Sequence, residues 1–168
     1  GTKIVILDCD FRQGDQHKNF NRNKIKLDEF VEANKNLEKY KIKDDLYFIP
    51  RPHKSSAYAL GVFESQAFAD MVADLKTRFD YVIIDTPPVL PVSDSLSISK
   101  LSDISLVVVR HDETRPRELK ECLALFNLSG ISDTFLVYNG YKKPLGYYGY
   151  DYYAYRYYSD SYDYVSKD

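Results

Sequence analysis

The sequence has little cysteine, no tryptophan, no long apolar run and almost no excess of either charge. Its two cysteines, Cys9 and Cys122, lie far apart and form no CxxC pair, so a disulfide or zinc framework is not expected. No run approaches the roughly 18 apolar residues of a membrane-spanning helix. A net charge of −2 at pH 7 offers no basic surface for nucleic acid. These absences predict a soluble, cytoplasmic protein without a nucleic-acid partner.

Five short apolar runs predict β-strands. Each run is apolar on both faces, which is typical of a parallel sheet that helices cover on both sides. The runs are KIVIL (3–7), LYFI (46–49), YVIID (81–85), ISLVVV (104–109) and TFLVY (134–138).

Apolar residues at helical spacing lie between these runs. The strongest such pattern covers residues 63–79, and a weaker one covers 28–40. Thr114 as N-cap, with Pro116 in the first turn, predicts a further helix. Because strands and helices alternate, we expect an α/β fold with a parallel sheet flanked by helices over residues 1–140.

The C-terminal residues have a different composition, because tyrosine, aspartate, serine and glycine replace the aliphatic residues there. This composition predicts a flexible tail over residues 141–168 that does not fold alone. Ten tyrosines are concentrated in it, namely Tyr147, Tyr148, Tyr150, Tyr152, Tyr153, Tyr155, Tyr157, Tyr158, Tyr162 and Tyr164.

Carboxylates follow two of the predicted strands. Asp8 and Asp10 close the first one, and Asp85 is the last residue of YVIID. Ligands of open α/β sheets bind beyond the carboxyl ends of the strands, and Mg²⁺ prefers oxygen ligands. The three aspartates therefore indicate a magnesium site that handles phosphate. The alternative for each of them is an ordinary role as a helix cap or turn residue.

Three segments, in this order, resemble the bacterial tyrosine kinases. KIVILDCDFRQG (3–14) is similar to their second Walker-type motif, and FDYVIIDTPPVLPVSD (79–94) is similar to their Walker B segment. The tyrosine-rich C-terminus resembles their phosphorylated cluster. The resemblance covers essentially the whole chain. It implies a deviant P-loop NTPase (SIMIBI-like) fold, and ATP and Mg²⁺ as cofactors.

The family roles fall on five residues. Asp85 would hold Mg²⁺ through water, and Asp8 and Asp10 would complete the metal environment. Either Asp8 or Asp10 would orient the attacking phenol or accept its proton. Arg12 would contact phosphate, although a surface ion pair is an equally good interpretation. Asn139 would lie near the adenine, and a role as a strand-end turn residue is the alternative.

The sequence departs from the family in one respect, because it contains no GxxxxGK[ST] loop to cradle phosphates. We expect an N-terminally incomplete kinase domain that is inactive alone and that lacks a central strand, with exposed apolar edges as the consequence. A degenerate domain that has lost nucleotide binding is the alternative.

The resemblance implies partners as well as chemistry. The ten tail tyrosines would be phosphorylated in trans within a ring-like homo-oligomer, and a tyrosine phosphatase would reverse the reaction. The protein would act at the inner face of the cell membrane, with a membrane polysaccharide co-polymerase region in cis or as activator, and would regulate capsular or exopolysaccharide synthesis and export. The alternatives are a partition-type ATPase switch and a non-catalytic module whose aromatic tail binds partners.

Overall fold

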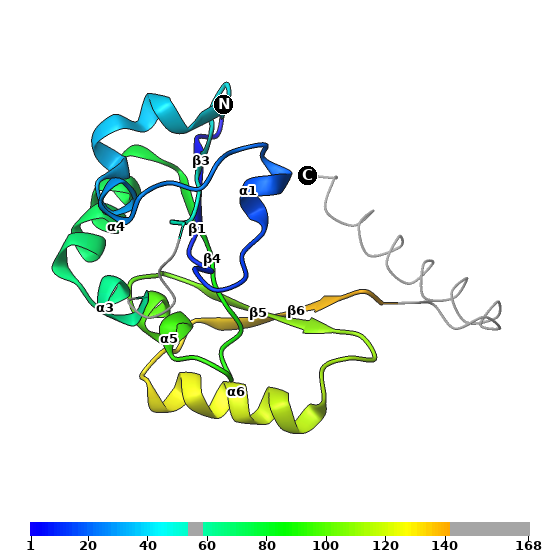
Figure 1. Ribbon diagram of the computed structural model, residues 1–168. Helices are drawn as coiled ribbons and strands as arrows, with labels where there is room; N and C mark the ends of the chain where they lie inside the picture. Colours follow the sequence, from blue (N-terminus) through cyan, green and yellow to red (C-terminus); the bar gives the residue numbers. More distant parts are fainter. Residues whose placement is uncertain (54–58, 142–168) are drawn as a thin grey trace, which may run out of the picture.

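The computed structural model describes residues 1–53 and 59–141, and their strands form two sheets (Figure 1). The first sheet has four strands in the order β2-β3-β1-β4, and the second has two strands in the order β5-β6. The strands are β1 (Ile4–Asp8), β2 (Lys41–Lys43), β3 (Leu46–Ile49), β4 (Tyr81–Asp85), β5 (Ser105–Arg110) and β6 (Thr134–Asn139).

The strands that matter for the site run parallel. β1 lies between β3 and β4 and pairs in parallel with both, and Asp8 is the register partner of Asp85. β5 and β6 also pair in parallel. All five predicted strands are confirmed to within one residue at each end. The sixth strand, β2, was not predicted, because its sequence KIK is short and polar, and it pairs with β3 in the antiparallel sense.

Helices lie beside both sheets. Figure 1 shows α4 beside the first sheet and α6 alongside β5 and β6. The helices are α1 (Gln16–Asn19), α2 (Leu27–Val31), the 3₁₀ helix η1 (Ala33–Tyr40), α3 (Ala59–Phe63), α4 (Gln66–Arg78), α5 (Asp94–Ser99) and α6 (Pro116–Leu128). None of the helices in the described ranges is both long enough and apolar enough to cross a bilayer.

Three helix boundaries differ from the predictions. The predicted helix 63–79 begins later, because Ser65 has extended backbone and caps α4. The predicted helix 28–40 is divided into α2 and η1, and η1 is itself kinked at Asn36, whose φ of −140° and ψ of 65° are not helical. Thr114 is not the N-cap of α6: Arg115 holds that place, and its N–H donates to the Glu118 carboxylate at 2.9 Å.

The cap of α4 gives a stability prediction. The Ser65 hydroxyl oxygen accepts a hydrogen bond from the Phe68 N–H at 3.2 Å. Ser65→Ala leaves this N–H without its partner at the helix end, so the free energy of unfolding should fall by about 1 kcal/mol. Urea unfolding followed by circular dichroism measures the change. Ser65→Asp, which keeps an acceptor oxygen, should lose much less, and equal losses in both variants would contradict the capping role.

The core lies between α4 and one face of the first sheet. Val5 and Leu7 point into it from β1, and Phe68 and Leu75 from α4; all four side chains are fully buried. The opposite face of the sheet is open at β4, where Ile83 is 49% exposed. A one-sided core of this kind leaves apolar surface in contact with water.

An apolar groove separates the two sheets. Its volume is about 1350 Å³, and its walls include Ile83 on β4, Leu106 and Val108 on β5, and Phe126 on α6. Within the described ranges, β4 pairs only with β1 and β5 only with β6, so the strand edges that face the groove are unpaired. Leu106 and Val108 are 63% and 59% exposed. The apolar edges expected from the sequence are therefore present along this groove.

Candidate active site at the ends of β1 and β4

The acidic residues of two neighbouring strands meet at one edge of the first sheet. Asp8 ends β1 and Asp85 ends β4, and the two are level in the parallel register. The Cys9 N–H donates to the Asp85 carbonyl at 2.8 Å, which holds the two strand ends together. Asp10 follows immediately in the loop after β1. The fold thus brings the three predicted carboxylates to the edge where ligands of parallel sheets bind.

Asp8 is completely buried, and neither of its carboxylate oxygens has a hydrogen-bond partner. Burial and, to a smaller extent, the charge of Asp85 together raise its pKa to about 6, although Arg51 acts in the opposite direction. A buried carboxylate without partners is costly, because its charge has lost the solvation of water. A cation or a proton at this position would relieve that cost.

Asp85 has a related environment. Burial raises the pKa of its carboxyl, and the charge of Asp10 adds to the effect. A hydrogen bond from the Gln16 side chain acts in the opposite direction and favours the charged form. Asp8 and Asp85 therefore share a local excess of negative charge that is well suited to a positive ligand.

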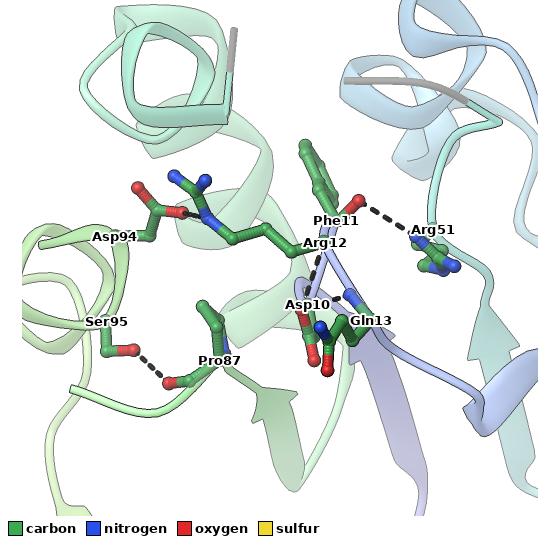
Figure 2. A network of polar contacts seen from close by, with 8 residues as sticks. All are labelled: Asp10, Phe11, Arg12, Gln13, Arg51, Pro87, Asp94 and Ser95. Atoms are coloured by element: carbon green, nitrogen blue, oxygen red, sulfur yellow. Dashed lines mark hydrogen bonds and ion pairs between the residues drawn. The ribbon is translucent and has the colours of Figure 1, made fainter. Parts of the chain in front are cut away.

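Asp10 is held by the backbone of its own loop. One carboxylate oxygen accepts hydrogen bonds from the N–H groups of Arg12 at 3.1 Å and Gln13 at 2.9 Å. Figure 2 shows this contact beside the ends of the strands. The side chain is partly exposed, in contrast to that of Asp8. Asp10 thus has a fixed orientation and can still be reached from solvent.

The loop between β1 and α1 (residues 9–15), called the acidic loop below, is anchored in the core through Phe11. Its ring is 3% exposed and packs against Phe30 and Phe63, with ring centroids 5.0 Å and 4.6 Å away. Its carbonyl accepts a hydrogen bond from the Arg51 guanidinium at 2.8 Å (Figure 2). These contacts attach the loop to α2, to α3 and to the segment after β3, so its backbone is firmly placed.

Arg12 forms an ion pair instead of extending into solvent. Its Nε lies 3.1 Å from Oδ2 of Asp94, which is only 2% exposed at the start of α5. The next residue, Ser95, donates its hydroxyl to the Pro87 carbonyl in the loop after β4 (Figure 2). α5 therefore connects the loops that follow β1 and β4. The contact of Arg12 with phosphate stays a prediction.

The other predicted site residues are not gathered with the aspartates. Asn139 ends β6 in the second sheet, and its side-chain oxygen accepts a hydrogen bond from the N–H of Gly140 at 2.7 Å, where φ is 70°. This is the turn role considered for it, and the adenine contact stays a prediction. The ten predicted phosphoacceptor tyrosines lie outside the described residues.

The predicted Mg²⁺ site has few side chains that could bind the ion. Within residues 1–53 and 59–141, no three His, Cys, Asp or Glu side chains are arranged to hold a metal by themselves. Mg²⁺ usually keeps several waters and takes only one or two carboxylates together with substrate phosphates. The unpartnered oxygens of Asp8, with Asp85 beside them, fit such a partly hydrated ion.

Sequence reasoning missed three residues of the site. Asp94 had a weak local signal, because acidic residues favour the first turn of a helix. Gln16 and Arg51 had none, since their roles depend on contacts with Asp85 and Phe11 that only the tertiary fold creates.

Sequence comparisons relate the chain to known tyrosine kinases. No family model matches the chain. The tyrosine-protein kinase ptk of Acinetobacter johnsonii is 33% identical over 145 residues, which are 84% of this chain and 20% of that protein. The tyrosine-protein kinase CpsD of Streptococcus pneumoniae serotype 4 is 30% identical over 125 residues, which are 72% of this chain and 55% of that protein. The chain thus spans only part of these relatives.

Solved structures give the same fold. The kinase domain of the Escherichia coli tyrosine kinase ETK superposes with a TM-score of 0.76 at 24% identity, over 90% of this chain and 62% of that chain. A ParA family ATPase from Chlorobium tepidum TLS superposes with a TM-score of 0.64 at 18% identity, over 82% of this chain and 61% of that chain. The predicted α/β P-loop NTPase fold is confirmed. By sequence, the chain is a relative of the bacterial tyrosine-protein kinases, and it shares the fold of the kinase domain of ETK.

Proposed function

We propose that the chain is part of a bacterial protein-tyrosine kinase that transfers phosphate from Mg-ATP to its own C-terminal tyrosines. The observation that carries the proposal is the buried, unpartnered carboxylate of Asp8 beside Asp85, at the level ends of β1 and β4. Phosphoryl transfer depends mainly on positioning and charge neutralisation, and this edge offers fixed negative groups for a phosphate-bound cation.

The three carboxylates have different roles in this proposal. Asp85 and Asp8 face the metal, whose bound charge would neutralise the phosphate oxygens. Asp10 is the candidate proton acceptor for the attacking phenol, because it is partly exposed whereas Asp8 is completely buried. Its orientation is set by the two loop N–H groups that bind it. A general base must reach the proton that it removes, and the partial exposure of Asp10 supports this assignment.

The phosphate-cradling loop is not among these 168 residues. In the proposal, another segment of the polypeptide supplies it by adding a strand in the groove between β4 and β5. Two unpaired edges and exposed apolar side chains line this groove, and Asp85 borders it. This arrangement favours an incomplete domain over a degenerate one, since the groove offers the hydrogen-bonding edges that a further strand needs.

The proposed cellular role rests on the resemblance to the bacterial tyrosine kinases. The proposed protein forms a ring-like homo-oligomer in which each subunit phosphorylates a neighbour's tail, and a tyrosine phosphatase resets it. It acts at the inner face of the membrane with a polysaccharide co-polymerase region and regulates capsule or exopolysaccharide export. Each phosphate adds about −1.5 to −2 charges at pH 7, so several in one tail would repel neighbouring subunits.

A partition-type ATPase switch is the second candidate, because a ParA family ATPase shares the fold. The test is mass spectrometry of the intact protein from its source, dephosphorylated and then incubated with Mg-ATP. For the kinase, we expect mass increments of phosphate within residues 147–164, and EDTA in the incubation should prevent them. ATP hydrolysis without tyrosine modification would favour the switch. If the protein shows neither activity, a non-catalytic binding module is the remaining interpretation.

A further inference from the structure

Gly14 closes the acidic loop against Asp8. Its N–H donates to the Asp10 carbonyl at 3.0 Å, which completes the turn that begins after β1. A methyl group at Gly14 would lie 2.5 Å from Oδ1 of Asp8 and 2.6 Å from the Asp10 carbonyl oxygen. Both distances are shorter than any normal contact between carbon and oxygen. The space that a side chain would take at position 14 is therefore occupied by the carboxylate of Asp8.

Backbone conformation does not explain this glycine. The described glycines with a left-handed φ are Gly130 and Gly140, and Gly14 is not among them. An alanine could thus adopt the local backbone angles of position 14. The requirement is one of space alone, and it is set by the two acidic residues.

The carboxylate of Asp8 depends on such packing for its position. Neither of its oxygens has a partner in hydrogen-bonding geometry, although the backbone of Asp10 is close enough to lower the pKa of the carboxyl. On the loop side, Oδ1 lies beside Gly14, which cannot withdraw without breaking its bond to the Asp10 carbonyl. The loop itself is fixed by Phe11 in the core and by the Arg12 ion pair with Asp94. The wall formed by Gly14 therefore decides where the Asp8 oxygens lie relative to Asp85.

We propose that Gly14 is a positioning residue, which holds the Asp8 carboxylate in register with Asp85 for a divalent cation by having no side chain. The inference rests on the proposed function, since it assigns a role toward the proposed metal site. Misplacing a ligand or its support in such a site typically costs 10- to 100-fold in metal affinity.

The experiment compares Gly14→Ala with Gly61→Ala in the intact protein. Gly61 lies in α3, where a methyl group would meet nothing within 4 Å, so it is a matched control. Mn²⁺, which shares the carboxylate preference of Mg²⁺, is titrated and its free fraction is measured by electron paramagnetic resonance. We expect the dissociation constant to rise at least 10-fold in Gly14→Ala and to stay within 2-fold in Gly61→Ala. Equal affinities in both variants would overturn the inference.

A second readout does not require metal. Asp8→Ala removes one of the two oxygens that clash with a methyl group at position 14, so it should recover part of the urea midpoint that Gly14→Ala loses. The same double variant remains informative if Gly14→Ala alone does not fold. If the midpoint shift of the double variant equals the sum of the shifts of the two single variants, the inference is overturned. If the unmodified protein binds no Mn²⁺, the proposed metal site fails, and the midpoints still decide whether Gly14 positions Asp8.

Discussion

Asp85→Asn should lower the rate of Mg-ATP-dependent tyrosine phosphorylation by about 10³-fold in the intact protein. The substitution keeps the shape of the side chain and removes the negative charge that faces the proposed cation. Charge stabilisation by a bound metal contributes several kcal/mol to a transition state, and each 1.36 kcal/mol corresponds to a factor of ten. Initial rates of phosphate incorporation at saturating ATP measure the loss.

This loss should not arise from unfolding. Burial and the charge of Asp10 raise the pKa of the Asp85 carboxyl, so its charge destabilises the folded state and Asn should not lower the melting temperature. Asp103→Asn is the matched control, because Asp103 is 83% exposed and forms only a surface ion pair with Lys76. Retention of activity in Asp85→Asn, or an equal loss in Asp103→Asn, would argue against a metal role for Asp85.

Asp8→Asn should stabilise the metal-free protein by about 2–3 kcal/mol at pH 7.5 while it lowers activity. Raising the pKa of a buried carboxyl from 3.8 to about 6 corresponds to roughly 3 kcal/mol of penalty on its charged form. The folded state holds the proton more tightly than the unfolded chain, so stability falls as pH rises from about 4 to 6 and stays low above 6. Asn is neutral throughout and avoids this penalty.

The gain should therefore depend on pH and on metal. Urea unfolding at pH 7.5 and at pH 4 measures the first dependence, and the advantage of Asp8→Asn should disappear at the lower pH. Added Mg²⁺ should stabilise the unmodified protein and reduce the difference. Asp28→Asn, at an exposed position, should show neither effect. A loss of stability in Asp8→Asn at pH 7.5 would contradict the view that a charged Asp8 destabilises the fold.

Stability and function are opposed at this site if both results are obtained. The residues that make the edge suited to a cation are the same ones that make the metal-free fold less stable. Functional sites commonly contain such groups, because polar groups that are already paired within the protein gain little from binding a ligand.

The elements that could be predicted were those with a strong local pattern. The run YVIID was recognised as a strand because it is short, apolar and β-branched, and the structure has it as β4 with the same bounds. The break at Ser65 was missed, because apolar spacing continues across it and hides the cap. The kink at Asn36 was missed for a related reason, since a weak periodic pattern does not distinguish α from 3₁₀ geometry.

Periodicity and residue type along the chain were sufficient to predict the α/β class, the parallel strands and the carboxylates at their ends. The burial of Asp8 without partners, the ion pair of Arg12 with Asp94 and the packing of Gly14 against Asp8 could not be predicted in this way. These facts join residues from different segments. Their physical origin is the close packing of loops that local propensity does not describe.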